Sequence, residues 1–366
     1  MFMEKLEDRR FLSAGLDFPP TRVLPTVHPE SIGVLPTVEF GLVNGRYVRK
    51  ATAVAADGRR YNFSLSGRGT GQAFADGDGF RLGLSGTDVR SALTVSSSSL
   101  GGLLTGITVG GALKSLSAKT CTVGGDLSTS GPLGRATFFA LSSESGSTIH
   151  FTIGSGGLPT NITAALVSDV VLYSPSDIQS LIVGQWLNLN RDPDSITASS
   201  IKKLAVTGGR GIPGNFSADI RLGPDPFALR SLTIKGAFQN ATLWASGGVG
   251  TAKIGSMSGS NIYLGVDPNG TTSPGGFIQV STFGSLVLTG RGTAFYDSNI
   301  VVPRISSLRL GKVADVVTTQ FQFGIQANFI GSYVRKTKTG GSIQYRKLAA
   351  PGVFDNVGTA FSARIV

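Results

Sequence analysis

Charged side chains are scarce in this sequence. They make up 15% of the 366 residues, against about 25% in typical globular chains. There is a single cysteine, Cys121, which excludes an intramolecular disulfide and a cysteine-based metal site. We expect its thiol to lie in an apolar layer, where cysteine behaves as a small hydrophobic residue.

Long apolar runs and helical patterns are also missing. No run approaches the about 20 apolar residues of a membrane span, so we expect no transmembrane segment. The N-terminus lacks the apolar region of an ordinary signal peptide. No segment carries a convincing apolar stripe with helical period, so helices should be few. The hydrophobic content of 40% nevertheless excludes a disordered chain.

Glycine is abundant, at 51 residues, and it punctuates a recurring phrase. In this phrase, hydrophobic residues stand at the first, fourth and sixth positions, any residue stands at the positions between them, and a glycine follows soon after. Clear copies begin at Ile201, Leu229, Phe283 and Ile305. A phrase that returns every 20–30 residues or so is the signature of a solenoid.

A second phrase alternates with the first. It consists of a small residue, then Asn or Asp, then alternating apolar residues, and its copies contain Asp169, Asp219, Asn261 and Asn299, with a looser copy at Asn240. We interpret the Asn or Asp as a turn residue whose side chain bonds the local backbone. Alternate apolar residues face one side of a strand, so stacked coils would bury them in ladders.

These patterns predict an all-β chain, a right-handed parallel β-helix (solenoid) with a small N-terminal cap. We expect a proline-rich flexible leader over 1–36 and a β-rich cap of hairpins over 37–96, with Asn44-Gly45 as a strong hairpin turn. The repeats would fill 97–366. At about 22 residues per coil this gives roughly 12 coils, about 4.8 Å apart. The alternating segment 353–366 would be the last coil or a docking edge for a partner.

Two regions resemble a known family. The first is Leu6-Glu7-Asp8-Arg9-Arg10-Phe11-Leu12-Ser13-Ala14. It resembles the LEPR-XLL motif near the N-termini of secreted and surface proteins of planctomycetes and related bacteria, with Asp8 where the motif often has Pro and Phe11 in place of a Leu. The second is the body, roughly 37–366, which is similar to the glycine-rich, parallel β-helix-like repeat proteins that often follow this motif. The resemblance implies export to an extracellular or cell-surface location, and it implies no activity.

The net charge of +11 is compatible with attraction to polyanions, such as extracellular acidic polysaccharide or another surface polyanion, although the scattered positions of the charges favour the alternative. The alternative is a dispersed basic surface that only aids solubility. We expect no specific nucleic-acid partner, and the oligomeric state stays open.

Catalytic phrases are absent. A polysaccharide lyase or hydrolase would need acid and base groups close in space. The acidic candidates are Asp169, Asp192, Asp194, Asp219, Asp225, Asp267, Asp297 and Asp315. Asp169 and Asp219 would stack on one face, but Asn261 and Asn299 occupy the same place in the phrase and favour a ladder of turn residues. His28 and His150 lack nearby partner ligands. We therefore predict no catalytic residue, no metal site and no cofactor.

Four aromatic residues are the candidates for stacking on sugars: Trp186, Trp244, Tyr263 and Tyr296. Strand alternation would place Trp186 opposite Leu187 and Leu189, on the outside. The alternative is that these rings cover the core at the edge of a coil.

The sequence therefore predicts a non-catalytic extracellular or cell-surface protein with a structural or adhesive role, in contact with glycans. The alternatives are a polysaccharide lyase or hydrolase that acts on acidic glycan, and a passive polyanion binder. The ligand and the anchoring mechanism stay open, as does whether the chain is part of a larger protein.

Overall fold

A computed structural model describes residues 37–143, 145–265, 277, 280–290, 292–314, 323–358 and 360–366. The chain divides into two compact units, Met1–Leu35 and Pro36–Val366, and only the second is described here. The LEPR-XLL-like motif, the predicted leader, His28, Asp267 and Asp315 lie outside the described residues.

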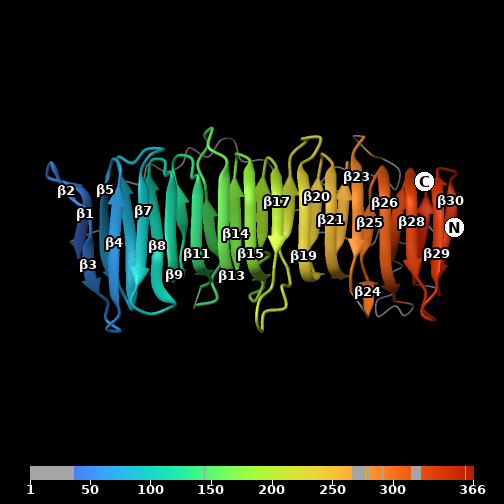
Figure 1. Ribbon diagram of the computed structural model, residues 1–366, viewed down its shortest axis with the longest axis horizontal. Coiled ribbons are helices and arrows are strands. Elements are labelled where there is room, and N and C mark those ends of the chain that lie inside the picture. Colours follow the sequence, from blue (N-terminus) through green and yellow to red (C-terminus); the bar gives the residue numbers. More distant parts are fainter. Residues whose placement is uncertain are drawn as a thin grey trace. The chain divides into compact units, whose positions relative to one another are not determined.

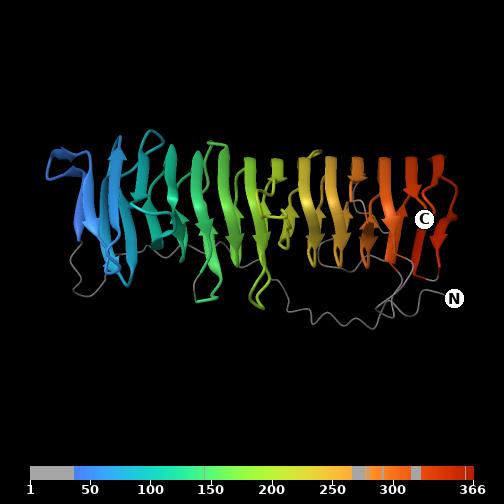
Figure 2. The same ribbon diagram turned by 60° about the horizontal axis from the view of Figure 1, so that its bottom comes forward.

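The described chain is a parallel β-solenoid, as predicted. Successive coils follow one another in chain order along the stack, so the ribbon colours run from blue through green to red, and antiparallel strands lie at both ends (Figures 1 and 2). Each coil contributes a strand to a first side, a short segment to a second side and a strand to a third side, and hydrogen bonds join each strand to its equivalents in the neighbouring coils.

The first side is formed by the strands that carry the first phrase and by their equivalents in the other coils. These are β7 (Ala92–Ser97), β9 (Ser115–Val123), β11 (Arg135–Leu141), β13 (Thr160–Ser168), β15 (Ile178–Leu187), β17 (Ile201–Val206), β19 (Leu229–Gln239), β21 (Val249–Ser258), β23 (Thr282–Leu288), β26 (Arg304–Val313) and β28 (Phe329–Lys336). Several of them continue past a register shift onto the second side, where β24 (Thr293–Tyr296) also lies.

The third side is formed by the strands that carry the second phrase and by their equivalents in the other coils. These are β6 (Gly79–Ser85), β8 (Gly102–Gly110), β10 (Leu127–Thr129), β12 (Ile149–Thr152), β14 (Val170–Ser174), β16 (Ser195–Ala198), β18 (Asp219–Leu222), β20 (Thr242–Ala245), β22 (Asn261–Leu264), β25 (Asn299–Val301) and β27 (Phe323–Ala327).

Equivalent apolar residues of successive coils lie in register and are buried. On the first side the ladder comprises Leu93, Leu116, Ala136, Ile162, Leu181, Leu204, Leu232, Ala252, Leu286, Leu308 and Tyr333. Ten steps cover the 240 residues from Leu93 to Tyr333, a mean of 24 per coil. The solenoid has about ten turns, fewer than the roughly 12 expected, because some coils are much longer than the clear copies of the phrase suggest.

Glycine marks the corner between the first and second sides because successive backbones approach closely there. The Gly236 N–H donates to Gly214 O at 3.0 Å, and the Gly290 N–H donates to Gly255 O at 2.7 Å. A Cβ atom at Gly255 would lie 2.3 Å from Gly236 O. The glycine that follows the first phrase is therefore required by the stacking of corners.

The corner between the second and third sides uses left-handed residues. Asn240, Gly259 and Asp297 have φ angles of 50°, 59° and 40°, a region that Gly, Asn and Asp adopt most readily. Each is followed by a small buried residue: Ala241, Ser260 and Ser298. These are the small residues of the second phrase, and they turn inward where the chain bends.

Antiparallel strands cover the N-terminal end of the stack. They are β1 (Val38–Val43), β2 (Arg46–Val48), β3 (Ala51–Val54), β4 (Arg60–Ser66) and β5 (Thr70–Asp76). Asn44 and Gly45 both have positive φ and join β1 to β2, which confirms this predicted turn. β6 and β7 already pair in parallel with β8 and β9, so the parallel ladders begin inside the segment 37–96.

Two antiparallel pairs close the C-terminal end. β29 (Ser342–Leu348) pairs with β28, and β30 (Gly352–Val357) pairs with β31 (Phe361–Ile365). β31 is also the last parallel rung of the third side, next to β27. The segment 353–366 is thus a final coil that carries its own antiparallel cover.

Candidate functional site

A row of outward-facing side chains runs across the third side. Strand register places Tyr173, Thr197, Arg221, Trp244 and Tyr263 at equivalent positions of successive coils. Each alternates with buried residues of its own strand. We call this set the aromatic row.

The centre of the aromatic row is held by ring contacts. The Arg221 Cζ atom lies 5.2 Å from the centroid of the Trp244 ring, within the range of a cation–π interaction. The Trp244 and Tyr263 ring centroids are 6.3 Å apart, with the planes tilted by 37°. Arg221 is exposed, whereas Trp244 and Tyr263 are half-buried. An indole and a phenol ring therefore meet solvent side by side, each fixed by its neighbours.

This arrangement suits contact with a sugar polymer. Aromatic rings present apolar area at low entropic cost, because they have few rotatable bonds. The guanidinium adds fixed hydrogen-bond donors beside the rings. Among the third-side strands from β8 to β27, the only Asp, Glu, Lys or Arg residues are Asp219 and Arg221. The surface around the row therefore has little net charge.

Tyr296 does not join this row. It lies on β24 of the second side, where it pairs with Ser258, and its ring centroid is 6.4 Å from that of Phe323. The four aromatic candidates were grouped by residue type alone. Of the four, Trp244 and Tyr263 lie side by side on neighbouring strands.

The outward orientation predicted for Trp186 is wrong. Its side chain is 1% exposed, and its Nε1–H donates to Asp194 Oδ2 at 2.8 Å. The ring centroid lies 5.8 Å from that of Phe216. Strand alternation is interrupted between Val183 and Trp186, where β15 turns the corner at Gly184, so the parity read from the sequence does not hold beyond that point.

Asp169 and Asp194 lie together beside Trp186. The Asp169 N–H donates to Asp194 Oδ2 at 3.1 Å, and Asp169 Oδ1 accepts from the Leu189 and Asn190 N–H groups. Burial raises the pKa of Asp194 to about 7, against the opposing effect of the Trp186 hydrogen bond. Both carboxyls are buried, so they serve as acceptors for the backbone and the indole and are closed to a polymeric substrate.

Asp219 does not stack with Asp169. It pairs with Ser195, and Val171 pairs with Ser195 in turn, so Asp169 is two residues out of step. Asp219 Oδ1 accepts from the Thr242 N–H at 2.8 Å, and burial raises the pKa of its carboxyl.

The Asn and Asp residues that begin the third-side strands bond the next coil. Asn299 Nδ2 donates to Asn261 Oδ1 at 3.0 Å, and Asn299 Oδ1 accepts from the Gly324 N–H at 3.2 Å. The expected bonds to the local turn are therefore replaced by bonds along the stack, because in-register strands place the neighbouring coil closest to these side chains.

Two further titratable candidates, His150 and Cys121, lie apart from these carboxyls. His150 is exposed on β12, with Nδ1 3.5 Å from Asp126 Oδ1. Cys121 is buried, as expected, and burial raises the pKa of its thiol to about 11. The described part of the chain contains no group of three or more His, Cys, Asp or Glu side chains suited to hold a metal ion. Within it, no helix has the length and apolar character needed to cross a membrane.

No family model matches the chain, and no similar protein was found among curated proteins or among solved structures.

Proposed function

We propose that the protein is a non-catalytic structural or adhesive β-solenoid of the cell surface or extracellular space, and that it contacts glycan through the aromatic row. The observation that carries this proposal is the register of Arg221, Trp244 and Tyr263 on consecutive coils. Such a row repeats at the strand spacing of about 4.8 Å. It offers an extended chain a line of contacts across the strands.

The surface location draws on the resemblance of the segment 6–14 to the LEPR-XLL motif. Fractionation of the native cells tests it: the protein should be found in the envelope or the medium, and a purely cytoplasmic protein would contradict the location.

The glycan contact is tested with Trp244→Ala. Native affinity electrophoresis in gels that contain xylan or hydroxyethylcellulose should show retardation of the wild-type protein. The variant should bind about three- to tenfold more weakly, since an aromatic contact contributes about 0.5–1.5 kcal/mol. The matched control is Phe227→Ala, which removes an exposed aromatic side chain outside the row and should bind like the wild type.

The same samples separate adhesion from catalysis. Incubation with neutral and acidic polysaccharides should release neither reducing nor unsaturated ends, even where binding occurs. Release of ends by the purified protein would favour the alternative of a lyase or hydrolase. Equal binding by the wild type and Trp244→Ala would show that the glycan does not bind at the aromatic row.

A further inference from the structure

The charged residues of the first side have a single sign. The first-side strands from β7 to β28 contain twelve Lys or Arg residues and no Asp or Glu. They are Lys119, Arg135, Lys202, Lys203, Arg230, Lys235, Lys253, Arg304, Arg309, Lys312, Arg335 and Lys336. Arg335 is buried in an ion pair; the others are exposed or half-buried. These strands therefore carry 12 of the 33 Lys and Arg residues of the chain and no carboxylate, with Lys312 and Lys336 past the register shift towards the second side.

Exposed cations without carboxylates lie together on β17, β19 and β21. These three neighbouring strands carry Lys202, Lys203, Arg230, Lys235 and Lys253, which we call the basic surface. All five side chains are exposed, and none of them forms an ion pair with any residue that the structure describes.

Like charges lie side by side in this surface. Ile201 pairs with Leu229 and Lys203 with Ser231, so Lys202 and Arg230 occupy the same level of adjacent coils. Like charges at such positions destabilise a sheet. A bound polyanion would offset this repulsion.

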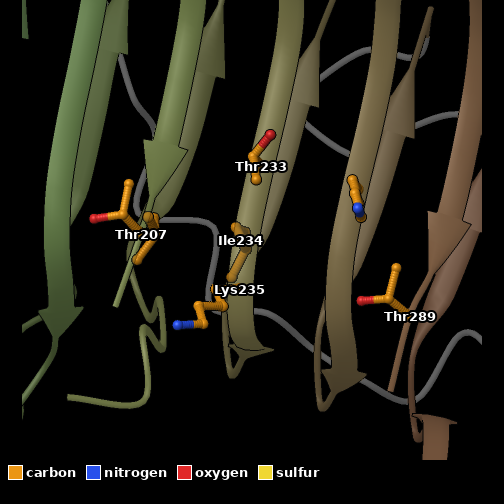
Figure 3. A pocket seen from close by; sticks show the side chains of 7 residues that line it. Thr207, Thr233, Ile234, Lys235 and Thr289 are labelled. Atoms are coloured by element: carbon orange, nitrogen blue, oxygen red, sulfur yellow. The ribbon is translucent and has the colours of Figure 1, made fainter. Parts of the chain in front are cut away.

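Lys235 and Lys253 of the basic surface line a hollow of about 480 Å³ (Figure 3). Figure 3 shows Thr207 and Thr289 on either side of Thr233, Ile234 and Lys235, and Lys253 completes the lining together with Val206. The hollow thus extends over the coils of β17, β19, β21 and β23.

The lining combines charge with hydroxyl groups. The Thr207 and Thr289 hydroxyls donate to the Val183 and Ile254 carbonyls, each at 3.3 Å, which leaves their oxygen lone pairs to accept from a ligand. The two ammonium groups supply donors for anionic oxygens. A ligand with both anionic oxygens and hydroxyl groups fits this set.

The surface lacks the rings that single-stranded nucleic acids stack on. None of the strands β17, β19, β21 and β23 carries an exposed aromatic side chain; Phe238 and Phe283 are buried. Stacking on aromatic side chains contributes much of the affinity of single-stranded nucleic-acid sites. The chemistry therefore favours an anionic carbohydrate over a nucleic acid.

The register sets the direction of the ligand. Lys253 pairs with Val287, and Val287 pairs with Arg309, so Lys253 and Arg309 lie two coils apart, about 9.6 Å at the strand spacing. Cations that recur along the stack match a chain that crosses the strands. We propose that the basic surface binds a linear anionic polysaccharide, carboxylated or sulfated, that lies along the stack over β17 to β26. This site is separate from the aromatic row and does not depend on it.

The test is a double variant, Lys235→Gln/Lys253→Gln, of the full chain. Binding to heparin and to polygalacturonate would be measured by isothermal titration at several salt concentrations, with neutral dextran as the blank. Affinity of the wild type should fall steeply with salt. The double variant should bind at least about tenfold more weakly, because it removes both ammonium donors of the hollow.

The matched control is Lys114→Gln/Lys119→Gln. It removes the same charge at exposed positions outside the hollow and should change affinity less than about twofold. If both double variants lost the same affinity, the binding would depend on net charge alone, and the proposed site would be wrong. Salt-insensitive binding, or tighter binding to single-stranded DNA than to either polysaccharide, would also overturn it. Trp244→Ala should leave this binding unchanged, so the two proposals fail independently.

Discussion

Asp194 is the least exposed acidic side chain of the described chain, at 1%. Its Oδ2 atom accepts from Trp186 and from the backbone of Asp169, but Oδ1 has no hydrogen-bond partner among the described residues. A carboxylate with one unsatisfied oxygen in an apolar corner is stabilised by protonation. Its titration is therefore linked to the stability of the fold.

The linkage predicts the sign of a pH dependence. Burial raises the pKa of Asp194 from 3.8 to about 7, so the folded state binds a proton that the unfolded state releases. The free energy of unfolding should therefore fall as pH rises from about 4 to about 7. In Asp194→Asn this fall should be smaller, because the amide stays neutral and keeps an acceptor for Trp186. Urea unfolding at a series of pH values measures it.

Asp192→Asn is the matched control, because Asp192 is exposed two residues away and its replacement should keep the wild-type slope. Burial also raises the pKa of Asp219, so the free energy of unfolding of Asp194→Asn should still fall somewhat as pH rises. A slope identical to that of the wild type would contradict the role given to Asp194.

At the corner between the first and second sides, the backbones of neighbouring coils lie so close that one added methyl group should destabilise the fold. Gly255→Ala would bring a Cβ atom to 2.3 Å from the Gly236 carbonyl oxygen, which belongs to the backbone and cannot rotate away as a side chain would. We expect a loss of about 1–3 kcal/mol in the free energy of unfolding, as in other overpacked interiors. Thermal unfolding followed by circular dichroism measures the loss.

Gly157→Ala provides the comparison for this corner. A Cβ atom at Gly157 would meet nothing within 4 Å, so the substitution should be neutral or slightly stabilising. Comparable destabilisation by both substitutions would show that the close approach at Gly255 is not the cause.

The C-terminal cover is fixed by one buried ion pair. Arg335 on β28 donates from Nε and Nη2 to the two carboxylate oxygens of Asp355 on β30, at 2.6 and 2.8 Å. The Tyr333 hydroxyl donates to the same carboxylate at 2.6 Å. The first and third sides are thus joined at the end of the stack.

Asp355→Ala should detach this cover. Removal of one partner leaves a buried guanidinium, which costs about 3–5 kcal/mol. Hydrogen exchange should then accelerate in β28 to β31, and exchange in the coils around β13 should stay slow because those coils contact only their neighbours. Tyr333→Phe, which keeps the ion pair, should have a smaller effect. Slow exchange at β30 in Asp355→Ala would contradict the proposed anchoring.

At the scale of the whole molecule, the sequence predicted the solenoid because two of its three sides carry a repeated apolar phrase. The second side has no repeated phrase in the sequence, because it is built from the ends of long strands and from single residues such as Phe216, which bridges Trp186 and Phe238. Such short pieces have no alternation to read. Trp186 was assigned the wrong orientation for the same reason.

The candidate site depended on register between coils, which spacing alone does not give. Leu243 and Ile262 are paired 19 residues apart, whereas Ala252 and Leu286 are paired 34 residues apart. The contact of Trp244 with Tyr263 follows only once the coils are aligned. The single sign of charge on the first side likewise needs the assignment of each strand to a side. The ion pair of Arg335 with Asp355 joins a repeat strand, β28, to β30, which belongs to no repeat.

The direction of the ladder hydrogen bonds has a mechanical consequence. Every coil is joined to the next by bonds that run along the stack, so tension between the two ends of the body pulls along those bonds and does not shear the strands past one another. The load then falls on one coil boundary at a time, beginning where an end cover yields. Each coil that peels away lengthens the chain and relaxes the pull on the coils behind it. The described body would in this way lengthen in steps under strain and keep the rest of its coils folded.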